Sequence, residues 1–512
     1  MGTTDLLLFT AIAAFVLLWG WSNTPWRRRA LWATALVACV AGVWSVVSFH
    51  WQVVPATGIA VGLLGALAVS KPGVRRFAFF RAHTQIRGPT QKTAVLLGLI
   101  TAGCAVPYYL YPMLELPAPD GSYPVGVRDF DLTRQAETGA SVAAAEVRHL
   151  RVRVWYPAAQ VETFPPRRYF TRDEAILKLP NFKLLHLYDV PTHGHVDAPV
   201  SPGGARFPVV VFSHGYVLYP GQNTVLMEQL ASHGYVVFSM SHPPDSASYR
   251  TLGGELVKES PWKPSEEVIA ALGPFIGAKT YEARYRGYEA FRRVIATDRL
   301  SRSTATWRDD NLFLTSALSS AAPPPAVADI ASRIDLDRLA YAGMSFGGGA
   351  AASTCQVDSR CKAVVSLDGV TWDLSMFDTD LHAPLLLLQS DWLTHPLFPE
   401  EPHDPGVNPQ DLAFERWEHA GERPDIFRYR MRDTAHLGMT DLVLIARPPV
   451  GATLYGEIDG RRAVAAINTF TLSFLDVYLR SEKTDFPVSA EAAFPEVVRH
   501  RTSALRAWWL TR

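Results

Sequence analysis

Neither sign of charge predominates in this sequence. Its 512 residues include 49 Lys and Arg and 49 Asp and Glu, so the formal net charge is zero at pH 7. Proteins that bind nucleic acid through its phosphates carry a basic excess or a basic face. The composition therefore predicts no nucleic-acid partner. Internal repeats and low-complexity tracts are also missing from the sequence.

Cysteine is scarce, with Cys39 and Cys104 in apolar runs and Cys355 and Cys361 close together in a more polar region. A zinc site requires further Cys or His residues at ligand spacing, and none flanks the second pair. Two interpretations remain for Cys355 and Cys361: a local disulfide, which requires an oxidising compartment, or two free thiols.

Histidines with the spacing of metal ligands are equally rare. His193 and His195 are separated by one residue, but no third ligand is in view, and we interpret both as loop residues. The sequence therefore predicts no metal site.

Long apolar runs, in contrast, are abundant near the start of the chain, at residues 6–21, 30–49, 53–70 and 93–113. Each approaches the length of a helix that crosses the hydrocarbon core of a bilayer. Aromatic residues that favour the headgroup layer gather near the ends of these runs: Trp19, Trp21, Trp26, Trp51, Tyr108, Tyr109 and Tyr111. Residues 1–115 are therefore predicted to form an all-α transmembrane domain of four helices.

Positive charges are distributed unevenly among the loops between these runs. Residues 27–29 of the first loop are all Arg, and the third loop holds six basic residues from Lys71 to Lys92, but the second loop has none. Because cytoplasmic loops are enriched in Lys and Arg, the first and third loops are predicted to be cytoplasmic. The N-terminus and everything after Met113 then lie on the outer side. In a bacterium, this describes an inner-membrane protein with a periplasmic C-terminal domain.

The rest of the chain alternates between strand-like and helix-like segments. Residues 116–146 are rich in Pro, Gly and small polar residues and are predicted to be a linker. Short apolar segments typical of strands buried on both faces of a parallel sheet follow at residues 150–156, 208–212, 235–240, 339–342, 363–367, 384–389 and 426–431. Helices such as 223–233 and 463–479 would cover this sheet. Residues 147–512 are therefore predicted to form an α/β domain with a mostly parallel, doubly wound sheet, and a helical insertion at about residues 249–325 is expected over the sheet edge.

A serine in a glycine-rich turn is the strongest chemical signal. Gly343-Met344-Ser345-Phe346-Gly347 matches the G-x-S-x-G nucleophile elbow of the α/β-hydrolase fold. The apolar segment 339–342 precedes it and the small residues 348–352 follow it, which is the order strand, turn, helix that the elbow requires. Ser345 is therefore the predicted nucleophile.

A second turn, after the apolar segment 208–212, has the sequence Ser213-His214-Gly215-Tyr216. In this fold one oxyanion-hole donor comes from the loop after an early strand, and the other comes from the residue after the nucleophile. The backbone N–H groups of Tyr216 and Phe346 are the predicted donors. His214 is interpreted as a structural residue that supports the loop.

The general base is expected in the C-terminal part of the chain, because the order in this fold is Ser, acid, His. His436 follows the last predicted strand and is the best candidate, whereas His382, His395, His403 and His419 lie in Pro-rich or helical contexts. Asp368 and Asp391 each end a predicted strand, and the pattern alone does not decide which is the acid.

Three segments carry a family resemblance: Phe212-Ser213-His214-Gly215, then Leu230-Ala231-Ser232-His233-Gly234-Tyr235 with Ser246-Ala247-Ser248-Tyr249, and then Gly343-Met344-Ser345-Phe346-Gly347-Gly348. They resemble the platelet-activating factor acetylhydrolase family of the plasma and intracellular type II kind, and the similarity covers most of residues 147–479. The family places its acid in a short Leu-Asp motif after the nucleophile helix, so the resemblance favours Asp368 over Asp391. The chain departs from the family in its four-helix N-terminus and in Met344, where His is common.

The resemblance implies an enzyme without metal or cofactor that cleaves short or oxidised acyl chains from phospholipids. We therefore expect a membrane-anchored serine ester hydrolase that forms an acyl-enzyme at Ser345. A lipase, thioesterase or polyester hydrolase with the same three residues is an alternative. A catalytically silent hydrolase fold that serves as a binding or scaffold module is another. The apolar helices contain almost no ionisable residues, so anchoring is expected of them rather than transport.

Overall fold

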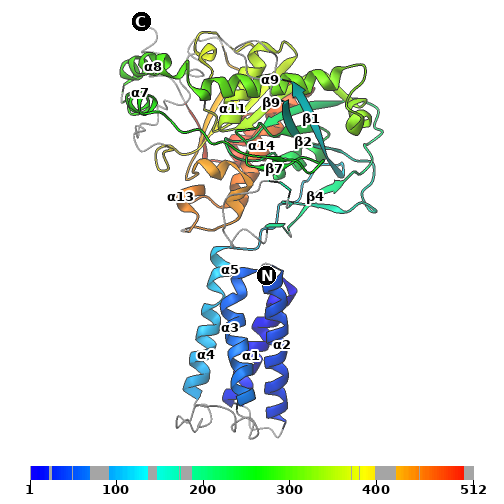
Figure 1. Ribbon diagram of the computed structural model, residues 1–512, viewed down its shortest axis with the longest axis vertical. Coiled ribbons are helices and arrows are strands. Elements are labelled where there is room, and N and C mark those ends of the chain that lie inside the picture. The colour runs from blue at the N-terminus through cyan, green and yellow to red at the C-terminus, as the bar shows by residue number, and fades with distance from the viewer. Residues whose placement is uncertain are drawn as a thin grey trace. The chain divides into compact units, whose positions relative to one another are not determined.

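The computed structural model describes residues 2–21, 26–48, 50–69, 91–135, 147–171, 173–174, 187–188, 190–278, 280–370, 372–379, 381–397, 423–448 and 450–500. The chain divides into two compact units (Figure 1). The first is built mainly from Met1–Glu115, and the fold of the second begins at Leu116.

The first unit is helical. Its elements are α1 (Thr3–Trp21), α2 (Arg27–Val47), the 3-10 turn η1 (Trp51–Val53), α3 (Val54–Val69), α4 (Gln91–Gly103) and α5 (Val106–Leu110). Four segments are long and apolar enough to cross a membrane: Thr3–Trp21, Arg27–Val47, Trp51–Val69 and Gln91–Leu110. Their ends lie within three residues of the predicted ends, and the fourth segment is interrupted before α5, where Pro107 occupies a first-turn position.

Small side chains fill the contact between α2 and α3, and many large apolar side chains of the bundle are exposed. Ala56 and Ala60 of α3 are fully buried, whereas Trp44 of α2 and Leu99 of α4 are about two-thirds exposed. A side chain at Gly42 would collide with Thr57, so α2 and α3 approach closely at this point. Close helix contacts through small residues, with large apolar side chains exposed around them, are typical of helices that pack in lipid.

The second unit is built on one large, mostly parallel sheet. The described residues form eleven strands in the order β13-β12-β11-β10-β9-β5-β6-β2-β1-β4-β3. The strands are β1 (Val125–Gln135), β2 (Val147–Pro157), β3 (Pro166–Arg168), β4 (Pro191–Val196), β5 (Phe207–Ser213), β6 (Val236–Met240), β9 (Ile334–Met344), β10 (Cys361–Leu367), β11 (Leu385–Gln389), β12 (Ile426–Met431) and β13 (Val497–Arg499). Six adjacent strands are parallel to one another, in the order β6, β5, β9, β10, β11 and β12. The next strand, β2, runs antiparallel to β6.

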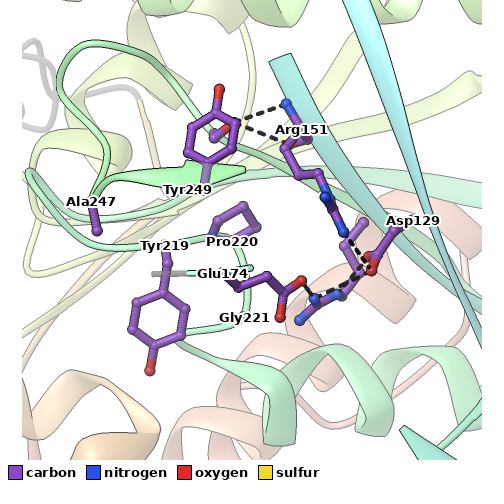
Figure 2. A pocket seen from close by; sticks show the side chains of 10 residues that line it. Asp129, Arg151, Glu174, Tyr219, Pro220, Gly221, Ala247 and Tyr249 are labelled. Atoms are coloured by element: carbon purple, nitrogen blue, oxygen red, sulfur yellow. Dashed lines mark hydrogen bonds and ion pairs between the residues drawn. The ribbon is translucent and has the colours of Figure 1, made fainter. Parts of the chain in front are cut away.

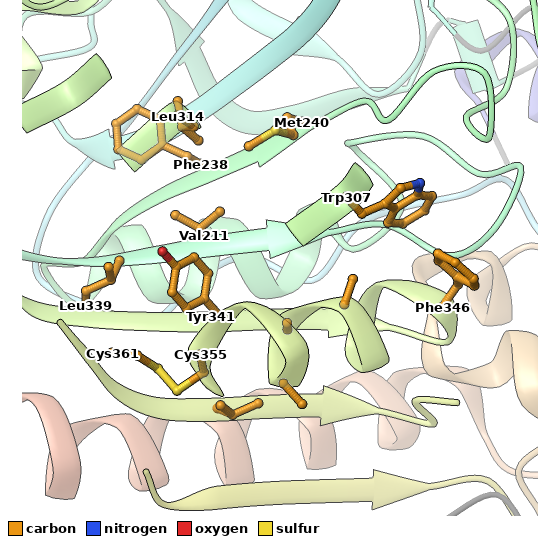
Figure 3. Packing of buried hydrophobic residues seen from close by; sticks show 14 of the residues in the cluster. Val211, Phe238, Met240, Trp307, Leu314, Leu339, Tyr341, Phe346, Cys355 and Cys361 are labelled. Carbon is orange, nitrogen blue, oxygen red and sulfur yellow. A yellow bond between two sulfur atoms is a disulfide. The ribbon is translucent and has the colours of Figure 1, made fainter. Parts of the chain in front are cut away.

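Helices cover both faces of this sheet. They are α6 (Thr224–Ser232), α9 (Arg299–Ser319), α11 (Phe346–Val357) and α14 (Gly460–Arg480), with shorter helices α10 (Ala328–Ala331), α13 (Ala452–Tyr455) and α15 (Val488–Ala493). Alternate residues of each strand point to opposite faces. Val211 and Tyr341 therefore pack on one face with Trp307 of α9 and the alanines of α11, while Val210 and Phe212 pack on the other face against α6 and α14. Figure 3 shows Val211, Tyr341 and Trp307 in the first of these clusters. The predicted doubly wound α/β sheet is confirmed.

The helical insertion requires a correction. Residues 249–325 contain a small hairpin, β7 (Tyr249–Arg250) and β8 (Leu256–Val257), followed by α7 (Glu266–Ile276), α8 (Tyr281–Ile295) and α9. However, α9 does not lie over the sheet edge, because its Trp307 and Leu314 are fully buried in the core beneath one sheet face. It is one of the covering helices of the fold.

The linker prediction for residues 116–146 is also wrong in part. Residues 125–135 form β1, which pairs with β2 along its whole length. The segment carries acidic residues at positions where a strand would be expected to be apolar, such as Asp129. That carboxylate is buried because arginines of β2 and β3 neutralise it, and the composition of one segment does not reveal such a partner.

Candidate active site

Ser345 lies in the sharp turn between β9 and α11. Its backbone has φ of 55° and ψ of −123°, a positive-φ conformation that non-glycine residues adopt only under constraint. A side chain at Gly347 would overlap the carbonyl oxygen of Ser213, and one at Gly343 would overlap the backbone of Gly347. The glycines of the motif are therefore required by the close packing of α11 on β5 and β9.

The structure brings Ser345, His436 and Asp368 into one hydrogen-bonded chain. The Oγ atom of Ser345 lies 2.9 Å from Nε2 of His436, and Nδ1 of His436 lies 2.5 Å from Oδ2 of Asp368. The histidine begins the 3-10 turn η7 (His436–Met439) after β12, and the aspartate directly follows β10. Since β9, β10 and β12 are parallel, their carboxyl ends meet at one edge of the sheet.

The two hydrogen bonds that link Ser345, His436 and Asp368 each have a fixed donor and acceptor. An aspartate carboxylate only accepts, so Nδ1 of His436 donates to Asp368. The other ring nitrogen, Nε2, is then free of a proton in the neutral imidazole and accepts from the Ser345 hydroxyl. The arrangement can remove a proton from a serine hydroxyl and return it to a leaving group.

Asp391, the alternative acid, makes different contacts. Its carboxylate accepts from the guanidinium of Arg430 at 2.5 Å and from the backbone N–H of Asp433 at 2.9 Å. Its own backbone N–H donates to the carbonyl of Thr434 at 2.7 Å. Asp391 therefore anchors the loop that carries His436, while the carboxylate bonded to the imidazole belongs to Asp368.

The two predicted oxyanion-hole residues are neighbours. The rings of Tyr216 and Phe346 have centroids 5.6 Å apart, and the loop that begins at Ser213 contacts the start of α11 at Gly347. Hydrogen bonds on both sides of Tyr216 hold its loop, from Gly215 N–H to the Gln222 side chain and from Val217 N–H to the carbonyl of Asp245.

The buried side chain of His214 supports this loop through hydrogen bonds. Its Nδ1 donates to the carbonyl of Gly215 at 2.7 Å, and Nε2 accepts from the hydroxyl of Ser246 at 2.8 Å. Burial, with the neighbouring His242, lowers the pKa of His214 to about 3, so the ring stays neutral. Its place in the structure agrees with the predicted structural role.

A second Ser–His–Asp arrangement, which the sequence did not reveal, lies in the interior. Nε2 of His242 lies 3.1 Å from the Ser213 hydroxyl, and Nδ1 lies 3.1 Å from the carboxylate of Asp310. All three side chains are fully buried, and the indole of Trp307 stacks on the imidazole. Arg148 also binds Asp310, at 2.6 Å, so this is an internal ion-pair network without access for a substrate.

A charged pocket lies beside the loop that carries Tyr216 and is lined in part by Tyr219 and Gly221 (Figure 2). The charged side chains of this pocket form ion pairs with one another. Burial alone would raise the pKa of Asp129, but the charges of Arg153 and Arg167 outweigh it and hold that pKa below its usual value. Both arginines also contact Glu174. The wall is therefore an ion-pair network that joins β1, β2 and β3.

His193 and His195 each contact a backbone carbonyl, of Leu116 and Phe164 respectively. Among the described residues, no group of three His, Cys, Asp or Glu side chains is arranged to hold a metal ion. Of the histidines set aside earlier, His403 and His419 lie outside the described residues.

Cys355 of α11 and Cys361 of β10 are joined by a disulfide with their Cα atoms 5.3 Å apart (Figure 3).

Comparison with known proteins agrees with this geometry. Residues 110–489 match the family model described as platelet-activating factor acetylhydrolase, isoform II. The chain belongs to this family. Relatives in it include the platelet-activating factor acetylhydrolases of Canis lupus familiaris and Bos taurus, each 23% identical over 72% of this chain and 78% of the relative.

A solved structure shares the fold of this acetylhydrolase-family chain. It is a ferulic acid esterase from Streptomyces cinnamoneus, with a TM-score of 0.55 and 22% identity, and the match covers 76% of this chain and all of that one. The α/β-hydrolase prediction and the family prediction are both confirmed. The chain is accordingly a carboxylic ester hydrolase, which acts on small-molecule or lipid esters.

Proposed function

We propose that this ester hydrolase uses Ser345 as a nucleophile, His436 as general base and acid, and Asp368 as the residue that orients the imidazole. The observation that carries the proposal is the hydrogen-bonded chain from Ser345 through His436 to Asp368 at a strained strand-to-helix turn. As the Ser345 oxygen attacks the ester carbonyl, His436 takes the hydroxyl proton, and it then protonates the leaving alcohol. Water attacks the acyl-enzyme by the same route and releases the acid.

The negative charge that develops on the carbonyl oxygen requires donors. We assign them to the backbone N–H groups of Tyr216 and Phe346, the latter being the first residue of α11. The positive end of a helix dipole favours charge at this position. Each such donor contributes about 3 kcal/mol to transition-state stabilisation in other hydrolases.

The substrate is proposed to be a short-chain or oxidised acyl ester, with phospholipids as the natural class. The support is family membership, because the two mammalian relatives are named as acetylhydrolases of platelet-activating factor. We expect purified full-length protein, in a non-ionic detergent, to hydrolyse p-nitrophenyl acetate and butyrate with a kcat/KM at least about tenfold above that for the dodecanoate ester.

The chain-length series separates this proposal from its alternatives. Preference for the dodecanoate ester would favour a lipase, and faster cleavage of the matching thioester would favour a thioesterase. Hydrolysis of none of these esters, together with no labelling of Ser345 by a fluorophosphonate probe, would favour a silent binding module and contradict the proposed chemistry.

We also propose that the four N-terminal helices anchor the enzyme in a membrane, with the catalytic domain on the outer side, which in a bacterium is the periplasmic side of the inner membrane. Their length and their exposed apolar side chains support the anchor, and the Arg and Lys residues of loops one and three support the orientation. The cysteine pair adds an independent argument, because disulfides persist in oxidising compartments.

The disulfide provides the test of this orientation. After expression in membranes and denaturation without reductant, alkylation is expected to add label to Cys39 and Cys104 only, as measured by intact mass. With reductant, Cys355 and Cys361 should be labelled as well. Labelling of all four cysteines without reductant would remove the support for an oxidising compartment.

A further inference from the structure

The acid of the active site needs support from outside its own strand. Asp368 has φ of 50°, in the left-handed region, so β10 ends at this residue and does not set the direction of its side chain. Its backbone N–H donates to the carbonyl of Leu388 at 2.6 Å, which ties it to the neighbouring strand β11. The side chain is nearly buried, and a buried carboxylate requires hydrogen-bond donors on both oxygens.

Ser390, directly after β11, supplies two of these donors. Its backbone N–H lies 2.9 Å from Oδ1 of Asp368, and its hydroxyl lies 2.7 Å from Oδ2. Oδ2 is also the atom that receives Nδ1 of His436. Ser390 therefore binds both carboxylate oxygens of Asp368. These two contacts orient the plane of the carboxylate independently of His436.

The direction of these bonds is fixed by chemistry. A carboxylate accepts only, so the Ser390 hydroxyl must donate to Oδ2. Hydrogen bonds to an ionised acceptor are shorter and about twice as strong as neutral ones. Ser390 is only 4% exposed, so water is poorly placed to replace its hydroxyl if that group is removed.

We propose that Ser390 is a positioning residue, whose amide and hydroxyl together hold the carboxylate of Asp368 in the orientation that receives His436. The inference rests on the catalytic roles proposed above, and Ser390 acts through Asp368 without touching the substrate. The backbone N–H of residue 390 persists in an alanine variant, so Ser390→Ala removes one of the two contacts and leaves the pairing of β10 with β11 intact.

The test compares Ser390→Ala with a matched buried serine. Ser239 of β6 is fully buried, and its hydroxyl has no hydrogen-bond partner within the part of the chain that the structure describes. In Ser390→Ala we expect kcat for p-nitrophenyl acetate and the rate of fluorophosphonate labelling to fall by about tenfold or more, with KM changed less than twofold. Ser239→Ala should match the wild type in all three quantities, and thermal unfolding of both variants measures any general loss of stability.

A spectroscopic readout reports on the pair without any substrate. The proton shared between His436 and Asp368 should give a far-downfield proton resonance, identified by its absence in His436→Gln, and Ser390→Ala should shift or broaden it. An unmoved resonance together with a labelling rate within twofold of the wild type would overturn the proposal, and so would an equal loss of rate in Ser239→Ala. If the wild type neither hydrolyses esters nor reacts with the probe, the proposed function fails, and the resonance alone then decides for or against the positioning role.

Discussion

Ser345→Ala is expected to lower kcat for p-nitrophenyl acetate by on the order of 10⁵-fold. The hydroxyl of Ser345 is the only group of the proposed triad that forms a bond to the substrate, so its removal leaves the oxyanion hole and binding alone. The measurement is steady-state hydrolysis by purified variant and wild type in the same non-ionic detergent. KM for residual activity and the melting temperature should stay near those of the wild type.

Ser213→Ala is the control that this chain offers. Ser213 belongs to the buried Ser213, His242 and Asp310 arrangement, which has similar hydrogen bonds but no access for a substrate. We expect this variant to keep kcat within about tenfold of the wild type, because its hydroxyl takes no part in acyl transfer. Residual activity above 1% in Ser345→Ala, or loss of activity in Ser213→Ala alone, would contradict the assignment of the nucleophile.

Asp368→Asn is expected to lower kcat by about 10⁴-fold. An amide at this position can donate to Nδ1 of His436, which favours the wrong imidazole tautomer and leaves Nε2 unable to accept the serine proton. The geometry at the site should be preserved because the two side chains are nearly the same size. Steady-state kinetics measures the effect, and fluorophosphonate labelling should slow in parallel with kcat.

Asp391→Asn provides the comparison for the acid. Its carboxylate anchors the loop of His436 through Arg430 and Asp433, so the variant should lose at most about 100-fold through displacement of that loop. The two variants therefore differ by about 100-fold or more in kcat. If Asp391→Asn were the more damaged of the two, the acid would have to be reassigned.

Much of the site could be predicted from the chain alone. The glycines of the elbow and the position of His436 after a late strand follow from the order of residues, because a nucleophile elbow requires small residues beside a strand and a helix. The choice between Asp368 and Asp391 could not be made in this way, since both end a strand. The register of β10 and β11 places Asp368 beside His436 and turns Asp391 toward Arg430, and a register is a property of the sheet.

Ser390 and the interior network of His242 and Asp310 show the same limit. Nothing in the sequence around Ser390 distinguishes it from other serines, and it matters only because β11 lies next to β10. His242 and Asp310 are far apart in the chain and meet only because α9 packs on the sheet. No local pattern predicts such a contact.

The sequence by itself determined the features that depend on composition over short distances. Four apolar runs specify four helices, and continuous β-branched segments specify strands buried on both faces. Tertiary structure decided the features in which one buried charge depends on another. Asp129 makes β1 look like a linker until arginines of β2 and β3 surround it. The physical reason is that burial of a charge is favourable only when its partner is present, and the partner comes from a distant part of the chain.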